Sequence, residues 1–501
     1  MHRLTSTRYL PYLIAALLSV LCSIWINSRE VVINPDAICY LQSAAAFKDG
    51  IHFAMNLCGQ AKWPFYSLLI AGFVHLTHFS YEISAYLLNG FFSLITVLVF
   101  MKIISVLTEK THLEKHKTVL VSLAAAVILL AHQFNAVKTY IIRDHGFWAF
   151  YLLSLLFLIQ YFRRHKNSDA IAWNLSIMIA TLFRIEGAIF LLVIPWIAWF
   201  DYQQPLSARF RSFLTLNSIS ILAAAVGASV LLFYHPPITG RLYELQFQLL
   251  HGLIVLQQNF QLKTIGLTQA VLGESGARDA VPVLFITLLV WYCISVITNL
   301  SWIYSFLVCY AWIKKCLITD RMSQLAIWSY VIINVVITAI FLGQSLFLSK
   351  RYLIALSLVL MIWVPFALMS LVQLWKKRKW PLLLVLFFIL LSAIGGLFNF
   401  GYSKKYIHDA GQWLSQNVPA QAILYSNDLQ LMYYSQHFGD QIYTQYEAYS
   451  NDKPRNKKYD YLALRTDQKE LHSATHLNNE ILVRVFQNKR GDQIQIYRRV
   501  S

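Results

Sequence analysis

The sequence predicts a polytopic α-helical membrane protein of about eleven transmembrane helices, with juxtamembrane helices and a small C-terminal soluble α/β domain. Of its 501 residues, 57% are hydrophobic and only 13% are charged, a composition typical of proteins that cross the bilayer many times. From about Tyr402 the apolar runs shorten and polar residues dominate. We therefore expect a transmembrane domain over residues 1–401 and an extracytoplasmic domain over residues 402–501.

The first apolar run, Tyr9–Ile26, sets the orientation of the chain. Arg3 and Arg8 precede it, and positive charges remain on the cytoplasmic side, so the N-terminus is expected in the cytoplasm. No small-residue cleavage site follows the run, which indicates a retained span rather than a signal peptide.

Ten further apolar runs of suitable length predict the remaining spans. They lie at Ala85–Leu107, Val119–Phe134, Gly146–Phe162, Ala170–Phe183, Gly187–Phe200, Phe213–Tyr234, Val281–Ile313, Leu325–Leu348, Tyr352–Trp375 and Pro381–Phe400.

Clusters of Lys and Arg decide how one more apolar run, Trp63–Phe79, is interpreted. The clusters lie at residues 102–117, 163–166, 209–211, 314–321 and 376–379. All of them fall in the cytoplasm, and the C-terminus outside it, if Trp63–Phe79 is an interfacial or re-entrant helix at the outer face. If that run crossed the bilayer, every later loop would be inverted.

The net charge of +18 does not indicate nucleic-acid binding, because most of the basic residues lie in short loops between spans. There they orient the protein and meet anionic lipid headgroups. Membrane lipids, rather than nucleic acid, are therefore expected as partners.

The six cysteines do not form a disulfide framework. Cys22, Cys293, Cys309 and Cys316 lie in or at the ends of spans and are interpreted as small buried apolar residues. The other two, Cys39 and Cys58, fall in the first outer loop. They could pair in an oxidising compartment, or remain two packed thiols.

In the C-terminal region, His408–Asn417 is predicted to be a helix, with strands after it. The strands are expected at Ala422–Ser426, Gln441–Tyr446, Tyr459–Leu464, Ile481–Gln487 and Gln493–Arg498, the last two joined by a turn at Asn488–Asp492.

Ionisable residues from separated segments converge on the expected outer membrane face. They are Asp36 in the first loop, the pairs Arg143–Asp144 and Lys350–Arg351, and Arg184 with Glu186 in a short turn. Sugar transfer from a lipid phosphate needs such a mixture. A carboxylate accepts the proton of the attacking hydroxyl, and cations stabilise the departing phosphate.

Each of these residues also has a purely structural interpretation. Asp36 could cap the helix that follows it. Arg143–Asp144 could be a local ion pair, and Arg184 could pair with Glu186 inside a buried turn. Lys350–Arg351 could anchor a span at the interface. No Asp-x-Asp, His-x-x-x-His or Cys-x-x-Cys motif occurs in an outer loop, so a divalent metal is possible but has no motif behind it.

Several short segments occur in a particular order along the chain. They are Asn34–Leu41 with Ala44–Gly50, Trp63–Tyr66 with Leu68–Leu69, Arg143–Asp144, Leu182–Gly187, Lys350–Leu353, and Ala410–Leu414 with Asn417–Pro419 and Ala422–Leu424.

In that order and topology they resemble the GT-C superfamily of membrane glycosyltransferases. The resemblance is greatest to bacterial members similar to protein mannosyltransferases and the lipid A aminoarabinose transferase. Two departures stand out: Ile185 replaces the proline of the family's Arg-Pro-Glu-Gly turn, and Ala37 stands where a second acidic residue often follows Asp36.

The resemblance implies a GT-C-like catalytic domain and a role for each candidate residue. Asp36 would be the catalytic base and Asp144 a second acidic active-site residue. Arg351 would contact the donor phosphate, assisted by Lys350, Arg143 and Arg184. Supporting positions would be held by Glu186 and Tyr352.

The function implied is transfer of a sugar, with inversion, from a polyprenyl-phosphate donor to lipid A or its core, another glycan, a lipid or a protein outside the cytoplasm. A bacterial inner membrane, with a periplasmic C-terminal domain, would be its location. A lipid-linked glycan polymerase or ligase is the enzyme alternative. A lipid or sugar flippase or transporter would carry charged residues within its spans, which are nearly charge-free here.

Overall fold

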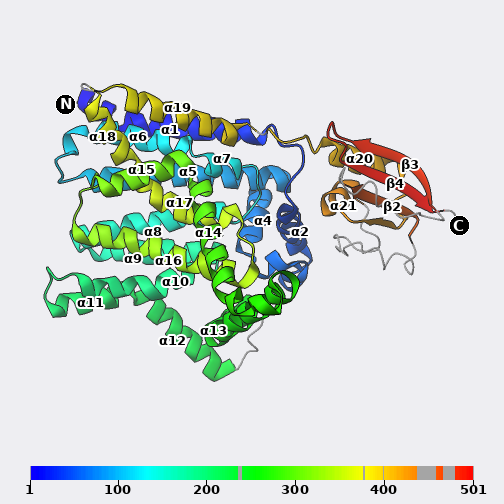
Figure 1. The fold of residues 1–501 in the computed structure, drawn as a ribbon, viewed down its shortest axis with the longest axis horizontal. Coiled ribbons are helices and arrows are strands. Elements are labelled where there is room, and N and C mark those ends of the chain that lie inside the picture. The colour runs from blue at the N-terminus through cyan, green and yellow to red at the C-terminus, as the bar shows by residue number, and fades with distance from the viewer. Residues whose placement is uncertain are drawn as a thin grey trace. The chain divides into compact units, whose positions relative to one another are not determined.

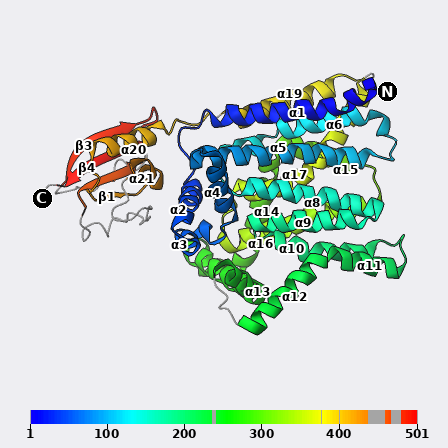
Figure 2. The same cartoon turned by 180° about the vertical axis from the view of Figure 1, so that it is seen from behind.

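A computed structural model describes residues 2–234, 240–375, 378–398, 400–436, 459–466 and 480–499 (Figures 1 and 2). The chain divides into two compact units. The bundle unit comprises Met1–Ser23, Leu88–Lys138 and Arg143–Phe398. The sheet unit comprises Ile24–Leu87, Thr139–Ile142 and Asn399–Ser501. Each unit is described separately below, and the boundary expected at residues 401 and 402 stays a prediction.

Most of the described chain is helical. The helices that pass through or belong to the bundle unit are α1 (His2–Asn27), α5 (Tyr81–Thr108), α6 (Lys117–Leu129), α7 (His132–Ala136), α8 (Asp144–Arg164), α9 (Asn167–Phe183), α10 (Gly187–Val193), α11 (Leu206–Leu216), α12 (Ser218–Tyr234), α13 (Gly240–Leu267), α14 (Ala280–Leu300), α15 (Trp302–Ile313), α16 (Arg321–Ser345), α17 (Ile354–Leu360), α18 (Val364–Leu374) and α19 (Trp380–Leu397). Short 3-10 turns include η4 (Ile194–Phe200), η7 (Lys350–Leu353) and η8 (Met361–Trp363).

The predicted polytopic membrane architecture is confirmed. Seven segments of the described chain are long and apolar enough to cross a membrane, and the bent pair α11–α12 would make an eighth. Three predicted spans are shorter: α6 has 13 residues, α9 has 17, and α10 continues into η4. The prediction of about eleven spans therefore exceeds the number found by length and composition.

One predicted span, Val281–Ile313, is wrong as a single helix. The chain breaks between α14 and α15 at Ser301, whose φ is 75°. The Ser301 side chain accepts a hydrogen bond from the backbone N–H of Tyr304 at 3.4 Å, so it caps the second helix. No glycine or proline marks the break.

One segment of the bundle interior, Lys350–Leu374, is enclosed over most of its length, and 94% of its apolar 18-residue stretch is buried. Buried polar side chains join neighbouring helices beside it. The Trp173 ring nitrogen donates to the Tyr330 hydroxyl at 3.1 Å, and that hydroxyl lies 2.7 Å from the Ser154 hydroxyl. These contacts connect α8, α9 and α16 and give the buried side chains of Ser154, Trp173 and Tyr330 hydrogen-bond partners. Helices α1 and α19 lie side by side in both views (Figures 1 and 2).

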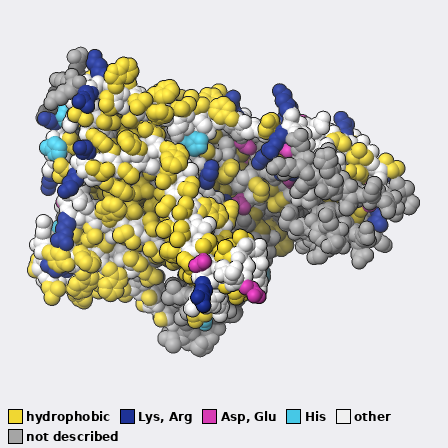
Figure 3. Space-filling view, in the orientation of Figure 1, with side chains coloured by type: hydrophobic (Ala, Val, Ile, Leu, Met, Phe, Trp, Pro, Cys, Tyr) yellow, Lys and Arg dark blue, Asp and Glu magenta, His cyan; other side chains and the backbone are white. Residues whose placement is uncertain are grey.

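The surface of the bundle unit is divided by residue type. In Figure 3 the face over the helices is mostly apolar, whereas Lys, Arg and His side chains gather along the left-hand edge. An apolar surface with basic residues along one edge is typical of a protein that lies in a bilayer.

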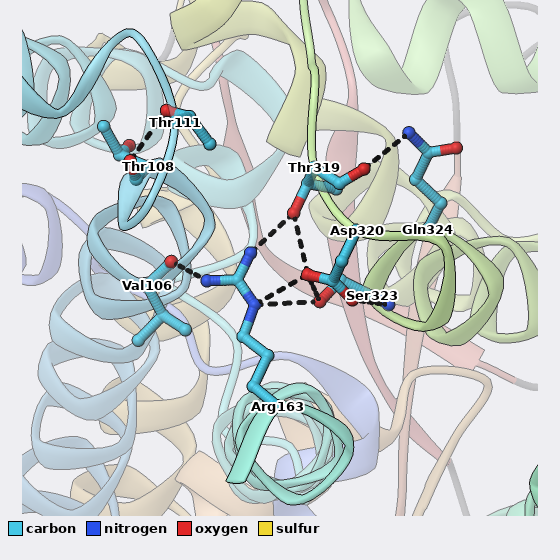
Figure 4. A network of polar contacts seen from close by, with 8 residues as sticks. All are labelled: Val106, Thr108, Thr111, Arg163, Thr319, Asp320, Ser323 and Gln324. Atoms are coloured by element: carbon cyan, nitrogen blue, oxygen red, sulfur yellow. Dashed lines mark hydrogen bonds and ion pairs between the residues drawn. The ribbon is translucent and has the colours of Figure 1, made fainter. Parts of the chain in front are cut away.

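At the end of α8, Arg163 from one predicted basic cluster holds three segments together (Figure 4). Its guanidinium binds Asp320 at 2.8 Å, Thr319 at 2.6 Å and the carbonyl of Val106. Asp320 in turn caps α16, because it accepts from the N–H of Ser323 at 2.8 Å. Arg163 thus fixes the ends of α5, α8 and α16 relative to one another.

The sheet unit contains the loop after α1 and the C-terminal region. In the loop lie α2 (Pro35–Ala46), α3 (Ile51–Asn56) and α4 (Phe65–Thr77). The predicted interfacial segment Trp63–Phe79 corresponds to α4, whose 13 residues extend only about 20 Å, too short to cross the hydrocarbon core.

The C-terminal region is an α/β fold, as predicted. Its elements are α20 (Lys405–Asn417), β1 (Leu424–Ser426), α21 (Leu429–Ser435), β2 (Tyr461–Thr466), β3 (Glu480–Gln487) and β4 (Gln493–Arg499). The sheet order is β1-β2-β4-β3, with β1 and β2 parallel and the other pairs antiparallel. The predicted strand Gln441–Tyr446 lies outside the described residues, and α21 was not predicted.

The hydrophobic core of this region includes a residue from the beginning of the chain. Val32, which is 3% exposed, packs with Ile407, Leu414 and Leu431. Residues just after α1 are therefore part of the same core as the C-terminal sheet.

Candidate active site

In the bundle unit, the centre of the predicted site is the Arg184 guanidinium. It binds Asp144 and also Glu186, the latter at 2.5 Å. The side chain of Arg184 is 13% exposed and that of Asp144 only 4%. One arginine between two carboxylates is thus enclosed at the point where α9 ends and α8 begins.

Close packing between α8 and α9 brings these residues together. A Cβ atom added to Gly146 would lie 2.3 Å from the ring of Phe183. Because Gly146 has no side chain, the ring of Phe183 can occupy that space, and Arg184 follows directly after it. The turn then closes through the Gly187 N–H, which donates to the Arg184 carbonyl at 3.0 Å.

The charges in this cluster reinforce one another. Burial alone would raise the pKa of Glu186, but Arg184, with a smaller contribution from Arg143, lowers it to about 2. Burial opposes the charge of Arg184, and the carboxylates of Asp144 and Glu186 raise the pKa of that guanidinium. Arg184 and Glu186 therefore remain ionised around neutral pH.

The guanidinium group of Arg143 is less fully hydrogen-bonded than that of Arg184. Its Nη1 atom is buried and has no hydrogen-bond partner among the described residues. A buried donor without a protein partner is unusual. Arg143 therefore presents a cationic group next to the enclosed ion pair.

The third segment of the cluster is η7. The Tyr352 ring contacts two guanidinium groups, and its centroid lies 4.8 Å from the Cζ atom of Arg184 and 5.2 Å from that of Arg351. Such cation–π contacts fix the ring and both cations relative to one another. Lys350, the residue before Arg351, is exposed.

Asn299 at the end of α14 holds this turn in place, and it was not predicted. Its amide donates to the carbonyl of Lys350 at 2.6 Å and accepts from the hydroxyl of Ser357 at 2.8 Å. Asn299 is 3% exposed. A polar residue at the end of a long apolar run is the signal that could have identified it.

Asp36, the predicted base, lies in the sheet unit near the start of α2. Its Oδ1 atom accepts a hydrogen bond from the side-chain amide of Gln60 at 3.0 Å. The N-cap position of α2 is held by Asn34, so the structural interpretation of Asp36 as the cap residue is wrong.

A disulfide fixes Gln60 beside Asp36. Cys39, one turn after Asp36, is bonded to Cys58, and their Cα atoms are 6.0 Å apart. Of the two alternatives left open by the sequence, the structure has the disulfide. The bond joins α2 to the segment that carries Gln60, which sets the direction of the Asp36 carboxylate.

The contacts also bear on the alternatives for Asp144 and Arg184. Asp144 pairs with Arg184, forty positions away in the chain, and not through a local pair with Arg143. The expected pairing of Arg184 with Glu186 is present. Among the described residues, no group of three potential metal ligands comes together.

A cavity of about 600 Å³ lies elsewhere in the bundle unit, around the Arg163 network. The described residues that line it include none of the predicted site residues. It is therefore separate from the Arg184 cluster.

No family model matches this sequence, and no curated protein matches it. Among solved structures, the chain is similar to an oligosaccharyltransferase of Archaeoglobus fulgidus tethered to an acceptor peptide. The TM-score is 0.49 at 13% identity, covering 90% of this chain and 60% of that chain. The chain thus spans about three fifths of that enzyme.

Two further structures are similar. ArnT from Cupriavidus metallidurans bound to undecaprenyl phosphate has a TM-score of 0.48 at 12% identity, over 98% of this chain and 97% of that chain. The mycobacterial arabinofuranosyltransferase AftD has a TM-score of 0.46 at 13% identity, over 97% and 41%. At TM-scores below 0.5, these similarities do not by themselves assign an activity.

Proposed function

We propose that this chain is an integral membrane glycosyltransferase that moves a sugar from a polyprenyl-phosphate donor to an extracytoplasmic acceptor, with inversion. One observation carries the proposal: charged groups from three separated segments meet at helix ends in the bundle unit, around Arg184. The cluster combines Arg143, a cation with a donor that is unpaired among the described residues, with the carboxylates of Asp144 and Glu186. In a protein with many apolar helices, this combination suits the binding of an anion that is attached to a lipid.

In the proposed reaction, an acceptor hydroxyl attacks the anomeric carbon of the donor sugar. Asp36 accepts the hydroxyl proton as the new C–O bond forms. The bond between the anomeric carbon and the phosphate oxygen breaks, and polyprenyl phosphate leaves with the electron pair. A single displacement inverts the anomeric configuration.

The contacts support different roles for the cations. Arg184 is already neutralised by Asp144 and Glu186, so we assign these three residues to positioning. We assign Arg351 and Arg143 to neutralisation of the leaving phosphate, because both are cationic and a buried donor of Arg143 has no hydrogen-bond partner among the described residues. Exposed Lys350 would add to the positive potential, and Tyr352 would orient Arg351.

The acceptor class follows from the expected location. With the N-terminus in the cytoplasm and the C-terminal region in the periplasm of a bacterial inner membrane, the acceptor would be lipid A or its core, a glycan, a lipid or a protein. A divalent metal is not assigned.

The test is sugar transfer by the purified full-length protein in detergent, with a panel of polyprenyl-phosphate sugars. Asp36→Asn keeps the size of the side chain but cannot accept the proton, so turnover should fall roughly a hundredfold or more. Asp49→Asn alters an exposed carboxylate of the same loop and is the matched control.

Each outcome decides a point. Loss of turnover in Asp36→Asn alone supports the base assignment, and the panel identifies the donor. Full activity in that variant would move the search for the base to Asp144 or Glu186. If the wild-type protein releases no polyprenyl phosphate from any donor, the glycosyltransferase proposal is wrong.

A further inference from the structure

Helix α21 of the C-terminal region forms hydrogen bonds with the backbone just before Asp36, the candidate base. The Tyr434 hydroxyl accepts a hydrogen bond from the N–H of Ile33 at 3.0 Å. The side-chain amide of Gln430 donates to the carbonyl of Ile33 at 2.5 Å. Gln430 and Tyr434 are four residues apart on α21 and so lie on one face of it. Together they satisfy both main-chain groups of one residue.

Helix α21 is itself fixed to the sheet. Asp428 caps α21 by accepting from the N–H of Leu431 at 2.9 Å. The same carboxylate binds Arg465 of β2 at 2.7 Å. Because α21 is tied to β2 and Ile33 is tied to α21, the sheet determines where Ile33 lies.

A short, stiff segment links Ile33 to Asp36, so the position of Ile33 constrains that of Asp36. The Asn34 side chain accepts from the N–H of Ile141 at 2.8 Å and donates to its carbonyl at 3.4 Å. Pro35 then fixes φ at the first position of α2, and the Ala37 N–H donates to the Asn34 carbonyl at 3.0 Å. Three residues reach at most about 10 Å, so little freedom remains between Ile33 and Asp36.

We propose that Gln430 and Tyr434 are positioning residues for the catalytic base, and that the C-terminal region thereby contributes to catalysis. This inference rests on the role of Asp36 given under the proposed function. Both hydrogen bonds are made to main-chain atoms of Ile33. They therefore fix the backbone that carries Asp36 regardless of the side chain at position 33.

The test compares three variants of the full-length protein. Tyr434→Phe removes the acceptor for the Ile33 N–H and keeps the ring. Gln430→Met removes the donor and keeps the length of the side chain. Tyr433→Phe is the matched control, because it removes a neighbouring hydroxyl on the same helix that makes no contact with Ile33. Sugar transfer and amide hydrogen exchange of residues 31–36 are measured for each.

We expect faster exchange at Ile33 in Tyr434→Phe and a fall in kcat of about fivefold to tenfold, the usual scale for one lost hydrogen bond. KM for the donor should stay close to the wild-type value. Tyr433→Phe should match wild type in both measurements.

A double-mutant cycle with Asp36→Asn separates positioning from general destabilisation. If Tyr434 acts through Asp36, adding Tyr434→Phe to Asp36→Asn slows transfer little further. An equal loss in both backgrounds, or unchanged exchange at Ile33, would overturn the inference while leaving the proposed function intact. If the wild-type protein transfers no sugar, the proposed function is wrong and the inference falls with it.

Discussion

Arg184 donates a hydrogen bond to Asp144, a residue forty positions earlier at the start of another helix. Both side chains are nearly enclosed. The pair depends on the absence of a side chain at Gly146, which lets the ring of Phe183 come close to α8. An ion pair fixed by helix packing holds its geometry, so the same residues can support the cations beside it.

Breaking this pair should destabilise the bundle unit. In Asp144→Asn the buried Arg184 loses one of its two counter-charges, which we expect to lower the free energy of unfolding by about 3 kcal/mol. Thermal unfolding in detergent measures the change. Glu109→Gln breaks the more exposed pair with Lys117 and should change stability by about 1 kcal/mol or less. Equal effects of the two variants would contradict the prediction.

The amide of Gln60 should matter for turnover because it donates to Asp36. Gln60→Ala removes that hydrogen bond, and we expect a loss in kcat of roughly fivefold, in line with about 1 kcal/mol. Gln60→Glu is expected to be slower still, since it places a second carboxylate against Asp36. Steady-state transfer assays check both. Gln60→Glu at the wild-type rate would show that the contact is irrelevant to catalysis.

Loss of the disulfide should loosen the same contact. In the chain-entropy account, a bond between Cys39 and Cys58, 19 positions apart, is worth about 3 kcal/mol. The double variant to alanine should therefore unfold earlier and turn over more slowly. Free Cys309, which was expected to be buried, is instead exposed at the surface of the bundle unit, and Cys309→Ala provides the control. Non-reducing peptide mapping verifies the bond in the wild-type protein.

Stability should depend on the charge of Glu30. Burial raises the pKa of this carboxyl, partly offset by Lys404. A raised folded-state value means that its favourable contribution is fully present below the unfolded value of 4.5 and is lost as pH rises through the folded value. Glu30→Gln should thus raise the unfolding temperature at pH 7 and have little effect at pH 4. A gain of equal size at both pH values would be inconsistent with this account.

Much of the helical architecture could be predicted because apolar runs report burial in lipid directly. The run Tyr9–Ile26 corresponds to α1, and Gly146–Phe162 lies within α8. The break at Ser301 could not be read in this way, since a serine in an apolar run gives no signal of left-handed backbone. Helix α21 has only seven residues, too few for a periodic pattern.

The sequence identifies the site residues by their type and position, but it does not show which of them pair with one another. Charge and loop position select Arg184 and Asp144, but their pairing depends on how α9 packs against α8 at Gly146. The roles of Asn299 and Gln60 depend on three-dimensional neighbours in the same way. Local sequence does not encode contacts of this kind, because any polar residue at a helix end could make several of them.

The contact between α21 and Ile33 joins positions about four hundred residues apart. During synthesis, the segment before Asp36 is therefore made about four hundred residues ahead of α21, its support. Until α21 has been made, that segment lacks its hydrogen bonds to Gln430 and Tyr434. A protein shortened before α21 would never complete the backbone arrangement around Asp36.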